Sequence, residues 1–106
     1  MPRQLLFAKG FADIIRNGQK RITIRRGERN YKVGDVVVGK CKEGDQLRLE
    51  ITDVRVSMLK FVLSDDLRDD GFVNADDAVY ILSQWYKGIS LDSTVTAIRF
   101  RYLGDA

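Results

Sequence analysis

Apolar and polar residues alternate in short runs over much of the chain, and several runs end at a glycine or an acidic turn residue. Ile22 and Ile24 alternate with polar neighbours, and apolar residues recur at every second position from Leu47 to Ile51. A period of two residues is typical of a strand with one buried face. Glu43-Gly44-Asp45, which follows the apolar run Val36 to Cys41, indicates a hairpin turn. The pattern predicts strands at residues 5–7, 22–25, 36–41, 47–56 and 95–102.

Three short stretches are predicted to be helices, two from the spacing of their apolar residues and the acidic stretch at 64–69 from its possible cap and the glycine that follows. They run from Phe11 to Asn17 before Gly18, from Ser64 to Asp69 before Gly71, and from Asn74 towards Gly88. Ser64 and Asn74 have side chains suited to capping the second and third helices, and glycine commonly ends a helix. Trp85 and Tyr86 extend the apolar face of the third helix. We therefore expect both rings to pack in the core. The alternative is that they offer a stacking surface for a base.

These elements amount to five or six mainly antiparallel strands and two or three short helices. Hairpin-rich sheets in so short a chain favour an α+β, mostly β fold arranged as a small, partly closed barrel. The length of 106 residues, without repeats or linkers, predicts a single domain over residues 1–106.

The sequence contains no histidine and a single cysteine, Cys41. These counts exclude Ser-His-Asp and Cys-His hydrolases as well as histidine or thiolate zinc sites. Any catalysis must use lysine, threonine, serine, tyrosine or carboxylates. We expect no cofactor and no bound metal, and we expect Cys41 to be a small buried apolar residue.

Two sequence features that direct proteins to membranes or for secretion are not seen. No apolar run approaches the roughly 20 residues that cross a bilayer, and the first ten residues do not resemble a signal peptide. A lone cysteine fits a reducing compartment. We expect a cytoplasmic protein without a membrane partner, as a monomer, although the sequence leaves oligomers open.

The charge is unevenly distributed. Residues 1–60 hold 14 lysines and arginines against 7 acidic residues, whereas residues 61–106 hold 4 against 8, and the net charge is +3. A basic half attracts phosphates, which favours an oriented contact with nucleic acid. An ordinary solvated surface explains so small a net charge equally well.

Many of the cations surround one predicted strand. They are Lys20, Arg21, Arg25, Arg26 and Arg29. Arginine offers a planar fork to a phosphate or a base edge, lysine offers a point charge, and Thr23 adds a hydroxyl. We interpret the strand as half buried, with its other face exposed as a cationic surface. The alternative is a partly exposed strand that simply carries long polar side chains.

Residues 13–25 read DIIRNGQKRITIR and residues 31–35 read YKVGD. This arrangement closely resembles the signature of ASCH domains, small β-barrels of the PUA-like superfamily. The Asp-Gly-Phe at 70–72, followed by a capped helix and a Trp-Tyr pair, resembles a later segment of these domains. The resemblance covers nearly the whole chain. It implies a PUA-like barrel with a cleft beside the Gly-Gln-Lys motif, which binds RNA or a modified nucleoside.

The resemblance and the residue types together give a set of expected ligand contacts. These are Gly18, Lys20, Arg21, Thr23, Arg25, Arg26, Arg29, Tyr31 and Phe72. Tyr31 and Phe72 lie in loop patterns and are candidates for stacking on a base.

One branch of the ASCH family hydrolyses the acetyl amide of N4-acetylcytidine with a lysine, a threonine and a later glutamate. By position, the lysine corresponds to Lys20 and the threonine to Thr23. No glutamate follows Glu50, so Asp70 takes the third position if a one-residue gap is allowed. This amidohydrolase is the alternative to a binding module. Nucleic-acid hydrolysis is a third possibility, for which the sequence offers no clear metal site or acid–base pair.

Three pairs of aspartates, at 65–66, 69–70 and 76–77, resemble a metal cluster. Two of the pairs lie where helices are expected to begin, where acidic residues complement the helix dipole. Of the six, we assign only Asp70 to the site.

Overall fold

The structure, a computed structural model, describes residues 3–106 and contains a five-stranded sheet with short helices. The strands are β1 (Gln4–Phe7), β2 (Ile22–Arg26), β3 (Val36–Cys41), β4 (Gln46–Met58) and β5 (Thr94–Asp105). The helices are α1 (Phe11–Arg16), the single 3-10 turn η1 (Leu59–Phe61), α2 (Ser64–Asp69) and α3 (Ala75–Leu82). The strand positions expected from the alternating pattern are confirmed.

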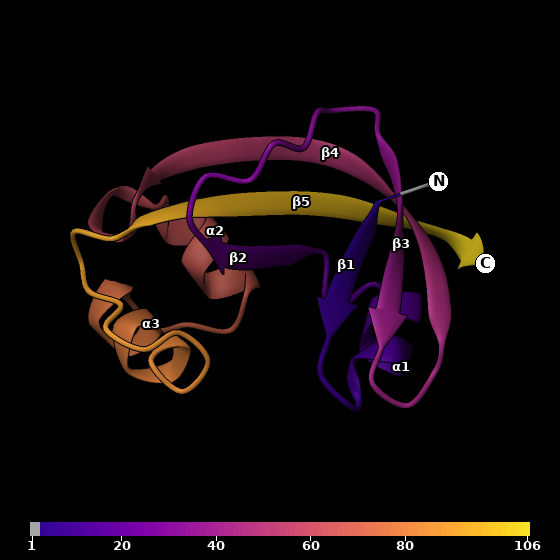
Figure 1. Ribbon diagram of the computed structural model, residues 1–106, viewed down its shortest axis with the longest axis horizontal. Helices are drawn as coiled ribbons and strands as arrows, with labels where there is room; N and C mark the ends of the chain where they lie inside the picture. The colour runs from indigo at the N-terminus through magenta and orange to yellow at the C-terminus, as the bar shows by residue number, and fades with distance from the viewer. Residues whose placement is uncertain (1–2) are drawn as a thin grey trace.

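The sheet has the order β1-β3-β4-β5-β2, so β1 and β2 form its two edges. β1 pairs with β3 in parallel, and all the other pairings are antiparallel. The register between β4 and β5 shifts at Arg48/Leu49 and at Ile51/Asp53. Such irregularities bend and twist a pair of strands. The long β4–β5 ribbon spans the molecule and curves the sheet into a half-barrel (Figure 1).

Two hydrophobic clusters stabilise the sheet, because successive side chains of a strand point to opposite faces. In β5, Ile98 and Phe100 belong to one cluster, together with α1, β1 and β3. Val95 and Ala97 belong to the other, together with β2, α2 and α3. The two groups of elements lie at opposite ends of the β4–β5 ribbon (Figure 1). Cys41 is buried in the first cluster, as expected.

The helix α3 begins and ends differently from α2. Asn74 caps α3, since its side chain accepts a hydrogen bond from the Asp77 amide at 2.8 Å. Ser64 does not cap α2: it is the first helical residue, and the capping position is taken by Leu63, which makes no side-chain bond. The expected cap at Ser64 is therefore wrong, because the helix begins one residue earlier than predicted.

The third helix is also shorter than its apolar pattern indicates. It ends at Leu82, and residues 83–87 form turns. Trp85 in these turns is 66% exposed, so the expectation that it packs in the core is wrong. Tyr86 is half buried against the second cluster. Beyond the end of the helix, Trp85 no longer shares the buried face of Ala78 and Leu82, whereas Tyr86 still packs against their cluster.

No helix within residues 3–106 has the length and apolar character needed to span a membrane.

The contrast between the two caps gives a first prediction. Asn74→Ala should lower the free energy of unfolding by about 1 kcal/mol, because it leaves the amide of Asp77 without its acceptor. Ser64→Ala should change it by less than about 0.5 kcal/mol. Urea unfolding of both variants measures the difference, and equal losses would contradict the assignment of the caps.

Candidate functional site

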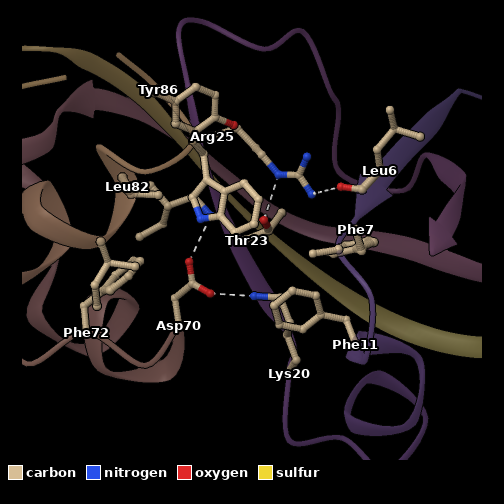
Figure 2. Close-up of a pocket in the computed structure, with 14 residues that line it drawn as sticks. Leu6, Phe7, Phe11, Lys20, Thr23, Arg25, Asp70, Phe72, Leu82 and Tyr86 are labelled. Atoms are coloured by element: carbon tan, nitrogen blue, oxygen red, sulfur yellow. Dashed lines mark hydrogen bonds and ion pairs between the residues drawn. The ribbon is translucent and has the colours of Figure 1, made fainter. Parts of the chain in front are cut away.

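A pocket of about 310 Å³ lies where the two edge strands of the half-barrel approach each other without pairing. Its walls come from β1, the start of α1, the end of α3 and the turn beyond it. Its charged side chains and the Thr23 hydroxyl come from the segment just before β2, from β2 itself and from the C-cap of α2. Both hydrophobic clusters contribute apolar residues to it, for example Phe7 and Leu82. The labelled side chains converge on this space from the two ends of the molecule (Figure 2).

Lys20 and Asp70 form a buried ion pair in this pocket. The Nζ atom of Lys20 lies 2.6 Å from Oδ1 of Asp70, and the two side chains are only 12% and 7% exposed. Lys20 also donates to the carbonyl of Ile22 at 2.9 Å. The other carboxylate oxygen of Asp70 accepts the amide N–H of Ile24 at 3.1 Å. Asp70 therefore joins the end of α2 to the free edge of β2 (Figure 2).

Local turns bring the two side chains together. Gly18 follows α1 with a φ of 84°, in the left-handed region that glycine adopts without strain. The chain then turns so that the amide of Lys20 donates to the carbonyl of Ile14. Asp70 is the C-cap of α2, and Gly71 with a φ of 91° reverses the chain after it. Each member of the pair thus sits at a glycine-terminated helix end.

Burial raises the pKa of Asp70, and the ammonium of Lys20 opposes this shift. A carboxyl group with a raised pKa binds its proton more tightly in the folded state than in the unfolded chain. Its contribution to stability is therefore largest below the ordinary pKa of aspartate and decreases as the pH rises through the raised value. When Asp70 is ionised, its buried carboxylate is stabilised by the hydrogen bonds that it accepts from the Lys20 ammonium and the Ile24 amide.

Arg25 connects the two edges of the sheet. Its Nε donates to the hydroxyl of Thr23 at 2.8 Å, and its Nη2 donates to the carbonyl of Leu6 in β1 at 2.7 Å. Burial lowers the pKa of the Arg25 guanidinium. Since Thr23 accepts this bond, its own hydroxyl hydrogen remains free to be donated.

Aromatic rings form much of the wall. The Lys20 ammonium lies 5.2 Å from the centre of the Phe11 ring, and the Arg25 guanidinium lies 5.0 Å from the centre of the Phe7 ring. Both are cation–π distances. Phe72, Trp85 and Tyr86 line other parts of the pocket. The site thus combines flat aromatic walls with a small polar group: the Asp70 carboxylate, the cations of Lys20 and Arg25, and the Thr23 hydroxyl, with the phenolic hydroxyl of Tyr86 in addition.

Four of the nine expected ligand contacts line the pocket: Lys20, Thr23, Arg25 and Phe72. The candidate catalytic acid Asp70 lines it as well. The other expected contacts do not: Gly18, Arg21, Arg26, Arg29 and Tyr31 lie outside it.

Tyr31 differs most from the expectation. Its side chain is 8% exposed in the first hydrophobic cluster, and Arg3 lies over its ring. A ring covered in this way offers no surface for stacking a base. Arg26 and Arg29 make bonds within the protein, Arg26 to the carbonyl of Lys87 at 2.8 Å and Arg29 to the carbonyl of Arg26 at 2.9 Å.

The strand β2 is also less open than the alternating pattern suggested. Thr23 is 5% exposed although it faces away from Ile22 and Ile24. Arg25 is half buried, and only Arg21 and Arg26 at the ends of the strand are exposed. The face expected to be a cationic surface is instead partly enclosed, because residues of β1, α1 and the turn after α3 surround it to form the pocket.

Sequence reasoning did not identify Phe7 or Phe11 as pocket residues, because apolar residues at these positions are equally typical of a buried strand or helix face. It weighed Trp85 and Tyr86 as a stacking surface for a base but favoured the core, because their spacing continues the apolar face of the third helix. The helix ends at Leu82, before either residue.

The aspartate pairs have structural roles. Asp66 and Asp69 both accept hydrogen bonds from Arg99 at 2.7 Å. Asp77 accepts the amide of Val73 at the start of α3. Within residues 3–106, no group of three or more acidic or cysteine side chains is arranged to hold a metal ion.

The sequence matches no family model, and no curated protein matches it. Solved structures do share its fold. A protein from Enterococcus faecalis assigned to the DUF984 family model has a TM-score of 0.77, is 13% identical, and is matched over 100% of this chain and 82% of its own.

Two of the matching structures are ASCH proteins. An ASCH domain from Lactobacillus crispatus has a TM-score of 0.63 and 19% identity over 88% of this chain and 70% of its own. A serine-to-alanine mutant of an ASCH protein from Zymomonas mobilis has a TM-score of 0.70 and 12% identity over 96% of this chain and 68% of its own. The fold is therefore that of an ASCH domain protein, an α+β, mostly strand half-barrel. Identities this low show the fold alone.

The buried ion pair yields a prediction about stability. Asp70→Asn keeps an acceptor for the Ile24 amide but leaves the Lys20 ammonium without a counter-charge. Breaking a buried pair in this way should lower the free energy of unfolding by about 3 kcal/mol or more. Lys20→Met combined with Asp70→Asn should restore a part of this loss, because no unpaired charge remains. Urea unfolding of the two single variants and the double variant tests it, and strictly additive losses would contradict the coupling.

Proposed function

We propose that the pocket binds one nucleoside, either free or as an unstacked residue of an RNA strand. The observation that carries the proposal is the pocket itself: about 310 Å³, flat aromatic walls, and Lys20, Thr23 and Asp70 converging on one side. Small-molecule sites are typically concave, mostly apolar and supplied with a few fixed polar groups. This volume is at the lower end of such sites, about 300 Å³, and suits a ligand the size of one nucleoside.

The polar groups suit the edge of a base. Lys20 has three N–H donors and uses two of them for Asp70 and the Ile22 carbonyl, which leaves one. The Thr23 hydroxyl has a hydrogen to donate. Asp70 retains acceptor capacity beyond its two bonds, because an ionised carboxylate has about four lone-pair sites. Donors and an acceptor on one wall match the mixed edges that nucleobases present to RNA-binding proteins.

The proposal includes RNA as a ligand because exposed arginines lie at the two ends of β2. Arg21, just before β2, and Arg26, its last residue, are both exposed, and β2 supplies Thr23 and Arg25 to the pocket. Exposed arginines attract phosphates, and this attraction weakens with salt. A strand whose unstacked base enters the pocket would bring its phosphates towards this surface. A pocket of about 310 Å³ has room for one base at a time, and it is too small to serve as a groove for a duplex.

Binding is measured by calorimetry with cytidine, uridine, adenosine, guanosine, N4-acetylcytidine and a short single-stranded RNA. We expect at least one of these ligands to bind. Lys20→Ala should weaken that binding by about 10-fold or more, because it removes a charged donor. Thr23→Val removes the hydroxyl at nearly constant shape and should weaken it less.

Lys32→Ala is the matched control, since Lys32 is exposed and lies outside the pocket. Its affinity for each nucleoside should equal that of the wild type. If no nucleoside binds, or if Lys20→Ala binds as well as Lys32→Ala does, the proposed site is wrong.

A second candidate is hydrolysis of an N4-acyl amide on a cytidine-type base. It is favoured because Lys20, Thr23 and Asp70, the three positions implied by the family resemblance, line the same pocket. The Thr23 oxygen would bond to the acyl carbon while the C–N bond breaks, and its proton would pass to the leaving amine. Water would then release the acyl group as an acid. Lys20 is placed to stabilise charge on the carbonyl oxygen or to carry the proton.

This candidate has its own test, the release of cytidine from N4-acetylcytidine. Thr23→Ser keeps a hydroxyl and should retain measurable turnover, whereas Thr23→Val should reduce kcat by at least about 100-fold. Equal rates for the two variants would show that Thr23 is not the nucleophile. Binding of N4-acetylcytidine without turnover would reject hydrolysis and leave the binding proposal intact.

A further inference from the structure

Trp85 is a large aromatic residue on the surface of the molecule, although its sequence spacing predicts a buried position. It is 66% exposed and also lines the pocket. Exposing so much apolar surface is unfavourable, by roughly 25 cal/mol for each Å² that could have been buried. An exposed tryptophan at the rim of a pocket therefore suggests a surface that a ligand covers.

The backbone around Trp85 is held in place. The amides of Trp85 and Tyr86 both donate to the carbonyl of Leu82, at 3.0 and 2.8 Å. Arg26 of β2 donates to the carbonyl of Lys87 at 2.8 Å. Leu82 on one side is buried in the second cluster, and Tyr86 on the other packs against it. The exposure of Trp85 is thus built into a fixed turn.

A second exposed apolar side chain lines the same pocket. Leu6 of β1 is 63% exposed, and its carbonyl accepts the hydrogen bond from Arg25. Leu6 lies on the opposite side of the pocket from Leu82 and Tyr86 (Figure 2). The turn that carries Trp85 and the strand that carries Leu6 therefore face each other across the opening.

Among the rings that line the pocket, Phe7 and Phe11 have a cation over them. Trp85 has no cation over its ring among residues 3–106, and it is 66% exposed. Much of the indole surface is therefore open for stacking. An indole combines a large flat surface with few rotatable bonds, so little conformational entropy is lost when it orders against a planar ligand.

We infer that Trp85 and Leu6 close the pocket over its ligand, with the indole of Trp85 stacked on the planar ring and Leu6 in contact from the opposite side. The inference rests on the proposed function and makes it more specific. The ligand must present a flat aromatic ring to the opening, so the sugar and any phosphate point past the rim. The affinity for the ligand then depends on Trp85, which belongs neither to the Gly-Gln-Lys motif nor to the Lys20–Asp70 ion pair.

Trp85 is the only tryptophan of the chain, so intrinsic fluorescence reports on this residue directly. The wild type is titrated with the nucleosides named above, by fluorescence and by calorimetry in parallel. We expect the fluorescence change to saturate with the same Kd as the heat. Trp85→Ala should weaken binding by about 10-fold or more, and Trp85→Phe, which keeps a ring, by less.

Tyr80→Ala is the matched control, because Tyr80 is an aromatic residue on α3 that is 72% exposed and does not line the pocket. It should bind as the wild type does. Since Trp85 is exposed, Trp85→Ala should fold normally, which a melting curve checks.

Two negative outcomes are distinct. Heat of binding without a fluorescence change, together with unchanged affinity in Trp85→Ala, overturns the role of Trp85 and leaves the pocket as a nucleoside site. The absence of any heat with every nucleoside overturns both proposals together.

Discussion

Burial of the Lys20–Asp70 pair is the constraint on which the pocket depends. Removing two charges from water costs several kcal/mol for each ion, and their attraction offsets this only when their remaining hydrogen-bonding groups are satisfied. Here the Ile22 carbonyl and the Ile24 amide supply those bonds. The pair therefore requires α2, the turn after α1 and the edge of β2 to lie in one arrangement. That arrangement is also the polar wall of the pocket.

The second constraint is that the barrel stays open. The N–H of Ile24 at the free edge of β2 is taken by the Asp70 carboxylate, and a carbonyl of β1 at the other edge is taken by Arg25. Exposed strand edges invite pairing with other chains, and charged side chains on an edge prevent it. In this fold the same side chains keep the two edges from pairing with each other. The space between them is where a ligand can enter.

Much of the fold was predictable, because each strand follows its local pattern. The bounds of β3 agree with the apolar run, and Asn74 caps α3 as its residue type suggested. The predictions that were wrong concern helix ends, at Ser64 and before Trp85, and positions decided by long-range contacts. Whether Thr23 is exposed depends on residues from β1, α1 and the turn after α3, which are distant in sequence. Trp85 follows the periodicity of a helix that has already ended.

The candidate site was predictable in part for the same reason. Lys20 and Thr23 were identified by their motif, and Asp70 by position in the resemblance, yet only the fold brings Asp70 within 2.6 Å of Lys20. The arginines around β2 were predicted to contact the ligand because of their charge, whereas the structure places Arg21, Arg26 and Arg29 away from the pocket. Charge along a sequence indicates a surface, but it does not show which side chains converge.

The central claim is that a nucleoside occupies the space between β1, β2 and the end of α3. The most direct measurement is an amide ¹H–¹⁵N NMR titration of the labelled protein with nucleosides. The account predicts concentration-dependent shifts that concentrate at Thr23, Arg25, Phe72 and the turn around Trp85. Shifts confined to the exposed arginines at the ends of β2, or no shifts with any nucleoside, would contradict it.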